Sequence, residues 1–589
     1  MRIPILHCFL FVTALLLTGC MGDSDEKKLY LHSENTVFAR LPGEPDRLSP
    51  LITVNAYSRT INELLFLNLL QFDPATLELE PQLAKSRPQI AEITDGPWKG
   101  GIAYTFELHE SAVWDNGAPI TGNDALFTFK ALFVPQVNSG SARSYLDFVK
   151  DLAVDATNPK RFTVYTDRKY ILGEAAISTM PVYPEYHYDK QGSLRGYALK
   201  DLTDPEQVAR LSEDTTLAAF AENLHSEQFS REKGFVNGAG AYALEEWVTG
   251  KQIALKRKTN WWGEALSKTY PLLRALPERL VFSIIPDQVT ALAALKSQEI
   301  DVASQIDVND FSEIRKDSAL QLLYNFYTPA ALQLFYIGIN TRNAKLNDKR
   351  VRRALAHTLD MDAIIRDLYA GMAQRVVGPF HPDKPYYHKN LPPIAYNVEQ
   401  ARTLLKAAGW EDTNGNGVVD KVLDGKRTEL ELNYLASAAS KFSMSLALVL
   451  KDNAAKAGIK INILPKEFPV LIESLKRREY ELHGGAWVAE PLPDDPKQLW
   501  HTESNTTDGG NRVGFGNAES DALIDEIRVT LDEQKRAELY RKFQELVYEE
   551  QPCIFLLAPQ ERLVIHKRFE ARPSVLRPGF FVNEFAVKR

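Results

Sequence analysis

The chain has 589 residues, of which 44% are hydrophobic and 25% are charged, and its formal net charge is −8. This composition is typical of a soluble globular protein, and the chain is too long for one hydrophobic core, so we expect about two to four lobes. The negative net charge, without any long basic run, excludes the usual kind of nucleic-acid binder.

The N-terminal residues predict export and lipidation. Residues 3–17 are almost wholly apolar, and LTGC follows directly. This run is shorter than the ~20 residues of a membrane-spanning helix and is typical of a secretory signal. LTGC resembles a bacterial lipobox, so we expect residues 1–19 to be a signal peptide, Cys20 to carry the lipid, and 20–28 to form a polar tether. The alternatives are an uncleaved anchor or an ordinary signal with a chance cysteine.

From Leu29 onward, short strand patterns alternate with amphipathic helical patterns. Apolar residues spaced i, i+3, i+4 predict helices, and short β-branched or alternating runs predict strands. In chain order we expect a helix at 60–72, a strand at 103–109, a helix at 123–133, strands at 161–166, 252–258 and 279–286, helices at 289–301, 348–371 and 398–410, a strand, helix and strand at 430–436, 440–457 and 460–468, and a strand at 552–558. Turn residues predict loops at 94–101, 378–393 and 504–517. The mixed alternation favours an α/β fold.

Catalytic and metal-binding motifs are missing from the sequence. It contains no G-x-S-x-G, H-E-x-x-H, G-x-x-x-x-G-K-[ST] or paired C-x-x-C. His381 and His388 share one loop without a metal-ligand spacing, so we expect surface or packing roles for them. Cys553 lies in an apolar strand pattern and should be a buried structural thiol. We therefore predict no catalytic residue, no metal and no cofactor.

One segment imitates a calcium loop. In DTNGNGVVDKVL (412–423), the EF-hand positions one, three, five and six are filled by Asp412, Asn414, Asn416 and Gly417, but the twelfth position is Leu423 in place of the bidentate glutamate. Asn-Gly pairs also favour tight turns. We expect a structural turn here, with a bound cation as the alternative.

Several segments in order resemble the bacterial extracellular solute-binding proteins of family 5, the dipeptide, oligopeptide and nickel-binding receptors of ABC importers. They are GEPDRLSPL (43–51), AVWDNGAPITGNDALFTF (112–129), GAGAYALEEWVTGKQIALKRKTNWWG (238–263), IDVA (300–303), YIGINTRNAKLNDKRVRRALAHTLD (336–360) and AGWEDTNGNGVVD (408–420). Each alone is weak, but the ordered set is specific and spans nearly the whole mature chain.

This resemblance implies a two-lobed, type II periplasmic-binding-protein-like clamshell with an extra middle domain. Lobe I would comprise 29–60, 175–284 and 556–589. The middle domain would be 61–174, and lobe II would be 285–555. Ligand would lie between the lobes, which would rotate about the crossings near 284 and 556.

The resemblance also implies the binding residues. In peptide-binding relatives, a strand matching GGAWVAE lines the cleft, and an aspartate at the position of Glu490 pairs with the peptide α-ammonium. Trp487, Val488 and Ala489 would supply backbone bonds to an extended peptide. Val54, Asn55 and Ala56 match the segment that pairs with the other edge of the peptide, and Tyr145 matches a cleft-facing tyrosine. The alternatives are an internal salt bridge for Glu490, packing alone for Trp487, and a core position for Tyr145.

The expected function is therefore that of a lipid-anchored, extracytoplasmic peptide receptor of an ABC importer, monomeric and not an enzyme, held at the periplasmic or cell-surface side of the membrane and delivering ligand to a permease. Glutamate in place of aspartate at Glu490 departs from the family pattern. Two alternatives stay open: a nickel complex, haem, opine or oligosaccharide as cargo, or a surface interaction or sensor module without an importer. Four tryptophans keep the sugar option open: Trp487, Trp261, Trp262 and Trp500.

Overall fold

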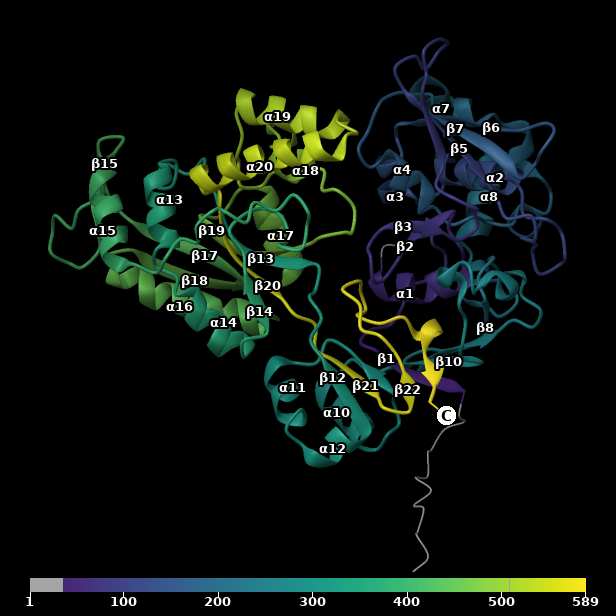
Figure 1. Cartoon of the computed structure of the whole chain (residues 1–589). Helices are drawn as coiled ribbons and strands as arrows, with labels where there is room; N and C mark the ends of the chain where they lie inside the picture. Colours follow the sequence, from purple (N-terminus) through teal and green to yellow (C-terminus); the bar gives the residue numbers. More distant parts are fainter. Residues whose placement is uncertain (1–34, 54, 508, 589) are drawn as a thin grey trace, which may run out of the picture.

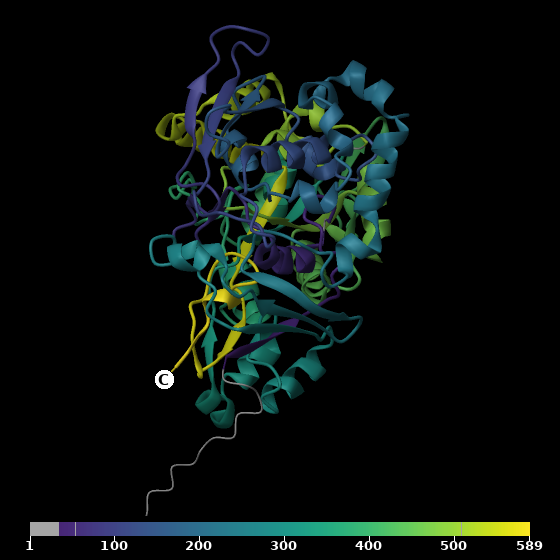
Figure 2. The same ribbon diagram turned by 90° about the vertical axis from the view of Figure 1, so that its right-hand side faces the viewer.

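The computed structural model describes residues 35–53, 55–507 and 509–588. The expected signal peptide and tether, with Cys20, lie outside these residues, and so does Val54. Figure 1 shows two upper bodies that face each other above a lower region of sheet, and Figure 2 shows the same arrangement from the side. Within the described part of the chain, no helix has the length and apolarity needed to cross a membrane.

The first lobe is built on a seven-stranded sheet. Its strands run in the order β12 (Tyr324–Tyr327), β21 (Leu563–His566), β11 (Val302–Ala303), β1 (Thr36–Leu41), β10 (Arg279–Ile284), β9 (Gln252–Arg257) and β8 (Tyr242–Val248). The central strand β1 is parallel to both of its neighbours, and five of its six residues are buried. Parallel strands buried on both sides need such a continuous apolar run. Helices α1 (Ala56–Leu65), α10 (Gln288–Lys296), α11 (Val308–Ile314) and α12 (Ser318–Leu323) belong to this lobe.

The second lobe contains a six-stranded sheet. Its order is β14 (Ala373–Arg375), β20 (Cys553–Pro559), β13 (Gln333–Ile339), β19 (Leu482–Val488), β17 (Glu431–Ser437) and β18 (Lys460–Lys466). Its helices are α13 (Lys349–Ala356), α14 (Met361–Tyr369), α15 (Val398–Ala407), α16 (Lys441–Lys456), α17 (Phe468–Lys476), α18 (Lys497–Trp500), α19 (Ala518–Val529) and α20 (Glu533–Glu550). Every residue of β20 is buried, and the free thiol of Cys553 with it, as predicted.

A smaller body, called the middle body below, carries a four-stranded antiparallel sheet, β4 (Gln89–Glu92), β5 (Ile102–Glu107), β7 (Arg161–Thr166) and β6 (Val149–Val154). Helix α2 (Gly122–Phe133) begins at a capping box between Thr121 and Asp124. Trp114 donates its indole N–H to the same carboxylate at 3.2 Å. The Trp, Thr and Asp of the W-x-N-G-x-P-I-T-x-x-D segment therefore form one hydrogen-bonded group at the start of α2. The surrounding elements are β2 (Leu70–Phe72), β3 (Leu79–Pro81), α3 (Gly140–Tyr145), α4 (Gly173–Ser178), α5 (Glu185–Tyr188), α6 (Leu199–Thr203), α7 (Pro205–Leu211), α8 (Thr215–His225) and α9 (Glu227–Arg231).

The chain crosses between the two large sheets later than we expected. Strands β11 and β12 lie in the first sheet although they follow the expected boundary at 284, and β20 stays in the second sheet past 556. The change of sheet falls at 328–332 and 560–562. The crossings are tied together, because Ala331 N–H donates to Pro559 O at 3.0 Å and Glu561 N–H donates to Pro329 O at 2.7 Å. We propose these as the hinge segments. Strand pairing between distant segments moves the boundary, and sequence periodicity does not register such pairing.

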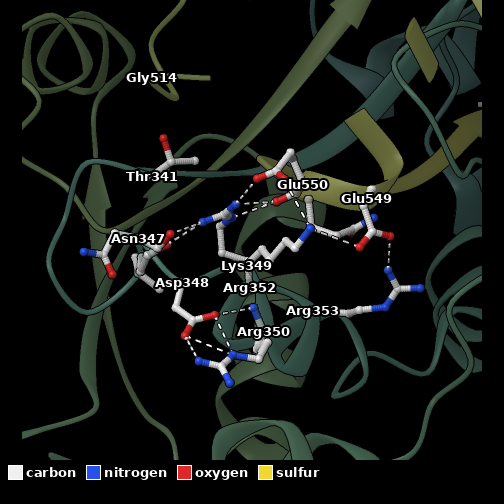
Figure 3. Close-up of polar contacts among 12 residues, drawn as sticks. Thr341, Asn347, Asp348, Lys349, Arg350, Arg352, Arg353, Gly514, Glu549 and Glu550 are labelled. Atoms are coloured by element: carbon white, nitrogen blue, oxygen red, sulfur yellow. Dashed lines mark hydrogen bonds and ion pairs between the residues drawn. The ribbon is translucent and has the colours of Figure 1, made fainter. Parts of the chain in front are cut away.

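Helix α13 carries the basic run of the segment 336–360 and is a structural anchor of the second lobe. Arg352 is 4% exposed, and its guanidinium donates to the carbonyls of Leu346, Asn347 and Glu550 (Figure 3). Glu550 is the last residue of α20, so Arg352 satisfies a carbonyl that the helix end leaves without a partner. Arg350 instead pairs with its own N-cap, Asp348, at 2.6 Å.

Candidate functional site

Strand β19 has a free edge where it faces the first lobe. It pairs with β13 along its whole length, from Leu482 to Val488. On its other side, however, β17 pairs only with Leu482 and His483. The second half of β19, GGAWV, is therefore an open strand edge within the described fold. An open edge offers backbone donors and acceptors in the spacing of an extended chain.

The alternation of the strand decides which of these residues face outward. Ala489 N–H donates to Leu332 O at 2.8 Å, which points it toward β13. Backbone groups of successive residues alternate between the two sides of a strand. Val488, Ala486 and Gly484 therefore present their N–H and C=O groups to the open edge. This corrects the expected set of backbone contacts. The Ala489 N–H already donates to Leu332 O, and the backbone groups of Trp487 point toward β13. Gly484 and Ala486, which sequence reasoning missed, present their backbone groups to the open edge together with Val488.

The glycine pair in this strand makes room for aromatic packing. A Cβ added at Gly485 would lie 2.4 Å from the ring of Tyr336. Tyr336 stacks on Trp487 with centroids 3.7 Å apart, and Trp487 meets Trp500 edge to face at 5.4 Å. The alternative of a packing role for Trp487 is therefore the one that the geometry favours. Trp500, Trp261 and Trp262 are all less than 10% exposed, so none of the four forms an exposed stacking platform.

Glu490 follows the open edge directly, and its side chain is exposed. Among the described residues, its carboxylate takes part in no ion pair within 4 Å and no hydrogen bond. The surrounding protein raises the pKa of Glu490, although the charges of Arg59, Lys384 and Arg577 oppose that rise. Among the described residues, Glu490 therefore does not form the internal salt bridge that was the alternative.

Lys384 is the nearby cation in the second lobe, and it is occupied elsewhere. Its ammonium donates to the backbone carbonyls of Glu490 and Leu492, and it lies 3.6 Å from Asp494. Tyr386 also donates to Asp494, at 2.7 Å. Together these contacts hold the EPLPDD loop in place and leave the Glu490 carboxylate without a bonded partner.

The first lobe and the middle body bring charged and aromatic groups toward Glu490. Arg59 lies on α1, and its positive charge opposes the rise in the pKa of Glu490 more strongly than that of any other cation. Tyr145, at the end of α3, is 42% exposed. Burial raises its pKa, and the charges of Glu490, Asp495 and Asp494 raise it further. Tyr145 therefore faces the same space as Glu490 and is not a core aromatic.

Asn55 and Ala56 have local roles in starting α1. The Asn55 carboxamide oxygen caps the helix by accepting from Tyr57 N–H at 2.8 Å and Ser58 N–H at 3.2 Å, and its amide donates to Glu44 O. The hydrogen-bonding groups of the Asn55 side chain are therefore occupied by these local contacts. Ala56 is exposed at the first turn. Val54 lies outside the described residues, so the expected pairing segment is described only in part.

The candidate metal ligands are engaged in local bonds. Asp412 accepts from the N–H groups of Gly415 and Gly417, which makes DTNGNG the structural turn we expected. Arg427 pairs with Asp420 at 3.0 Å. His381 is 1% exposed and packs at the crossing, and His388 lies 3.0 Å from Glu545. Among the residues that the structure describes, no three His, Cys, Asp or Glu side chains gather as metal ligands would.

Two sheets joined by paired crossings, with an open strand edge and an unpaired carboxylate between them, define a two-lobed binding protein. The model of the bacterial extracellular solute-binding proteins, family 5, matches residues 78–510. The chain belongs to this family, whose members are binding proteins of transporters and not enzymes.

The most similar relatives agree with this assignment. The oligopeptide-binding protein AppA of Bacillus subtilis is 24% identical over 571 residues, covering 95% of this chain and 94% of the relative. The heme-binding protein A of Haemophilus influenzae is 23% identical over 568 residues, covering 92% of each.

Solved structures confirm the expected fold class. The structure of AppA in complex with a nonapeptide has a TM-score of 0.67 at 22% identity, over 94% of this chain and 99% of that chain. The ABC transporter substrate-binding protein CtaP of Listeria monocytogenes has a TM-score of 0.72 at 20% identity, over the same shares.

Proposed function

We propose that the protein is a lipid-anchored, extracytoplasmic receptor that binds peptides between its lobes and delivers them to an ABC importer. The observation that carries this proposal is the open edge of β19, which ends at the exposed and unpaired carboxylate of Glu490. An extended peptide would extend the sheet by pairing with Gly484, Ala486 and Val488, and its α-ammonium would pair with Glu490. Backbone pairing of this kind tolerates many peptide sequences.

The electrostatics of Glu490 support a cationic ligand group. A carboxylate whose ionised form is disfavoured by its surroundings gains most from a cation that arrives with the ligand. Arg59 and Arg577 already lie near, so a fully anionic ligand end would find counter-charges a short distance away. A peptide has both charges at its two ends, which suits this distribution.

The charge pairing is tested by a two-by-two comparison. Losing one member of a desolvated charge pair costs roughly 2–5 kcal/mol, which corresponds to about 30-fold to several-thousand-fold in affinity. Glu490→Gln should therefore weaken peptide binding at least about 30-fold in calorimetry. N-acetylated peptide should bind the wild type poorly, and the variant should discriminate little between free and acetylated termini.

Equal binding of free and acetylated peptide by the wild type would contradict the pairing. A non-peptide cargo, such as the haem in the name of the Haemophilus relative, would then become the leading candidate. Mass spectrometry of the ligand that co-purifies from the exported protein distinguishes these cargoes directly.

The lipid anchor has its own test. If Cys20 is the lipidated N-terminus, Cys20→Ser should release a folded protein from the membrane fraction while leaving peptide affinity unchanged. A variant that stays membrane-bound with residues 1–19 attached would instead indicate an uncleaved hydrophobic anchor.

A further inference from the structure

A pocket of about 750 Å³, which includes space open to solvent, lies in the first lobe beside the proposed peptide site. Helix α1 lines it with Glu63 and Leu64, and Leu67 follows just after the helix. Residues of the C-terminal segment 578–584, Tyr242 and Trp261 also line it. Its ionisable residues are Glu63, Glu584 and Arg274, which give the pocket a formal charge of −1 when all three are ionised.

The C-terminal segment connects this pocket to the open edge of β19. Arg577 precedes the first pocket residue of that segment, Pro578, and donates to the Gln333 side chain at 3.0 Å. Gln333 is the register partner of Val488, two residues before Glu490. The charge of Glu490 acts on Glu63, so the acidic group of the pocket lies near the carboxylate at the end of the β19 edge.

Glu63 is the more exposed of the two acids in the pocket. Its side chain is exposed whereas Glu584 is half-buried, and among the described residues neither carboxylate makes an ion pair within 4 Å or a hydrogen bond. Arg59, one helical turn earlier, acts on both Glu63 and Glu490 without bonding to either. The cation that acts on Glu584 is Arg274, which lines the same pocket. Because Glu63 is exposed and lies near Glu490, it is the better placed of the two to receive a cation that arrives with the ligand.

We propose that this pocket binds the side chain of a lysine or arginine of the ligand, with Glu63 as the residue that selects the positive charge. The apolar lining suits this occupant, since the methylene stems of Lys and Arg pack on apolar surface while their charged heads reach a carboxylate. The inference rests on the proposed peptide function. It adds a preference for basic peptides, which the open β19 edge alone does not supply.

The test is calorimetry with tetra-alanine and three variants in which lysine replaces the second, third or fourth alanine. The wild type should bind at least one lysine peptide roughly 10-fold more tightly than tetra-alanine, as expected for a partly desolvated ion pair. Glu63→Gln should abolish this preference while still binding tetra-alanine, which also shows that the variant is folded. Glu63→Asp should retain part of it.

The control is Glu222→Gln, an exposed residue of α8 that changes the net charge equally; it should keep the full preference. If tetra-alanine binds and no lysine peptide binds more tightly, the basic pocket is refuted while the peptide function stands. If neither tetra-alanine nor a lysine peptide binds, both proposals fall. A preference that survives Glu63→Gln would assign the charge selection to another residue and overturn the role of Glu63.

Discussion

Single side chains in this protein carry the functional information, and Glu63 is the clearest case. Burial raises its pKa to about 7, Arg59 opposes this rise and Glu490 adds to it. The other charged groups of the same pocket are Glu584 and Arg274. A carboxyl group with a raised pKa in the folded state destabilises the fold once the pH is high enough to ionise it.

The sign of the effect on stability follows directly. Between about pH 4.5 and 7 the folded state binds more protons at Glu63 than the unfolded state, so stability falls as pH rises, and the penalty is complete above about pH 7. The full shift would amount to about 3 kcal/mol. Because water reaches the side chain, screening reduces this to on the order of 1 kcal/mol. In the ligand-free protein, Glu63→Gln should therefore raise the urea midpoint at pH 8 and leave it unchanged near pH 4. An equal gain at both pH values would mean that the charge of Glu63 is not the cause.

At the scale of elements, one buried guanidinium, that of Arg352, supports the contact between α13 and α20, beside the more exposed ion pairs of Lys349 and Arg353 with Glu549. Arg352→Met should leave the carbonyls of Leu346, Asn347 and Glu550 without their donor, at a loss of about 2–4 kcal/mol. Arg350→Met is the matched control on the same helix. Its ion pair with Asp348 is largely solvated, so its loss should be below about 1 kcal/mol. Urea unfolding and hydrogen exchange at the end of α20 measure both, and equal losses would contradict the anchoring role of Arg352.

Local patterns predict single elements well and their limits poorly. The strand expected at 161–166 is β7, with the same bounds, because its β-branched alternation is self-contained. The helix expected at 348–371 is two helices, α13 and α14, since Asp360 caps a new start by accepting from Ala363 N–H. The amphipathic pattern continues across that break and hides it. The helix expected at 60–72 ends at Leu65, since the apolar run that follows suits a buried strand equally well.

The candidate site was predictable only where one segment carries it. The GGAWVAE strand and its carboxylate could be found because the residues are contiguous. The Glu63 pocket combines α1, the region around Trp261 and the C-terminal segment 578–584, which are far apart in the chain. Periodicity and spacing describe only neighbours along the chain, so the sequence could not predict that these three segments meet in one pocket.

At the scale of the whole molecule, the middle body touches the second lobe on the side away from the crossings. The Tyr170 hydroxyl donates to Asp495 at 2.9 Å, Arg528 binds the same carboxylate at 3.0 Å, and Ile171 N–H donates to Arg528 O at 2.9 Å. Asp495 ends the EPLPDD loop that begins at Glu490. A ligand held by Glu490 would therefore steady the loop that makes this contact, and the contact would favour the closed arrangement of the lobes.

Closure can be measured with one pair of tyrosine variants. Adding a peptide that binds should reduce the radius of gyration of the wild type in small-angle scattering, as for lobes that rotate about 328–332 and 560–562. Tyr170→Phe should lower peptide affinity about 5-fold, because one hydrogen bond of about 1 kcal/mol is lost from the closed state alone. Tyr197→Phe is the control, since its hydroxyl donates to Asp214 at 2.8 Å within the same body and should not affect affinity. An unchanged radius with a confirmed binder would argue against rotation of the lobes, and equal effects of the two variants would show that Tyr170 acts on folding and not on closure.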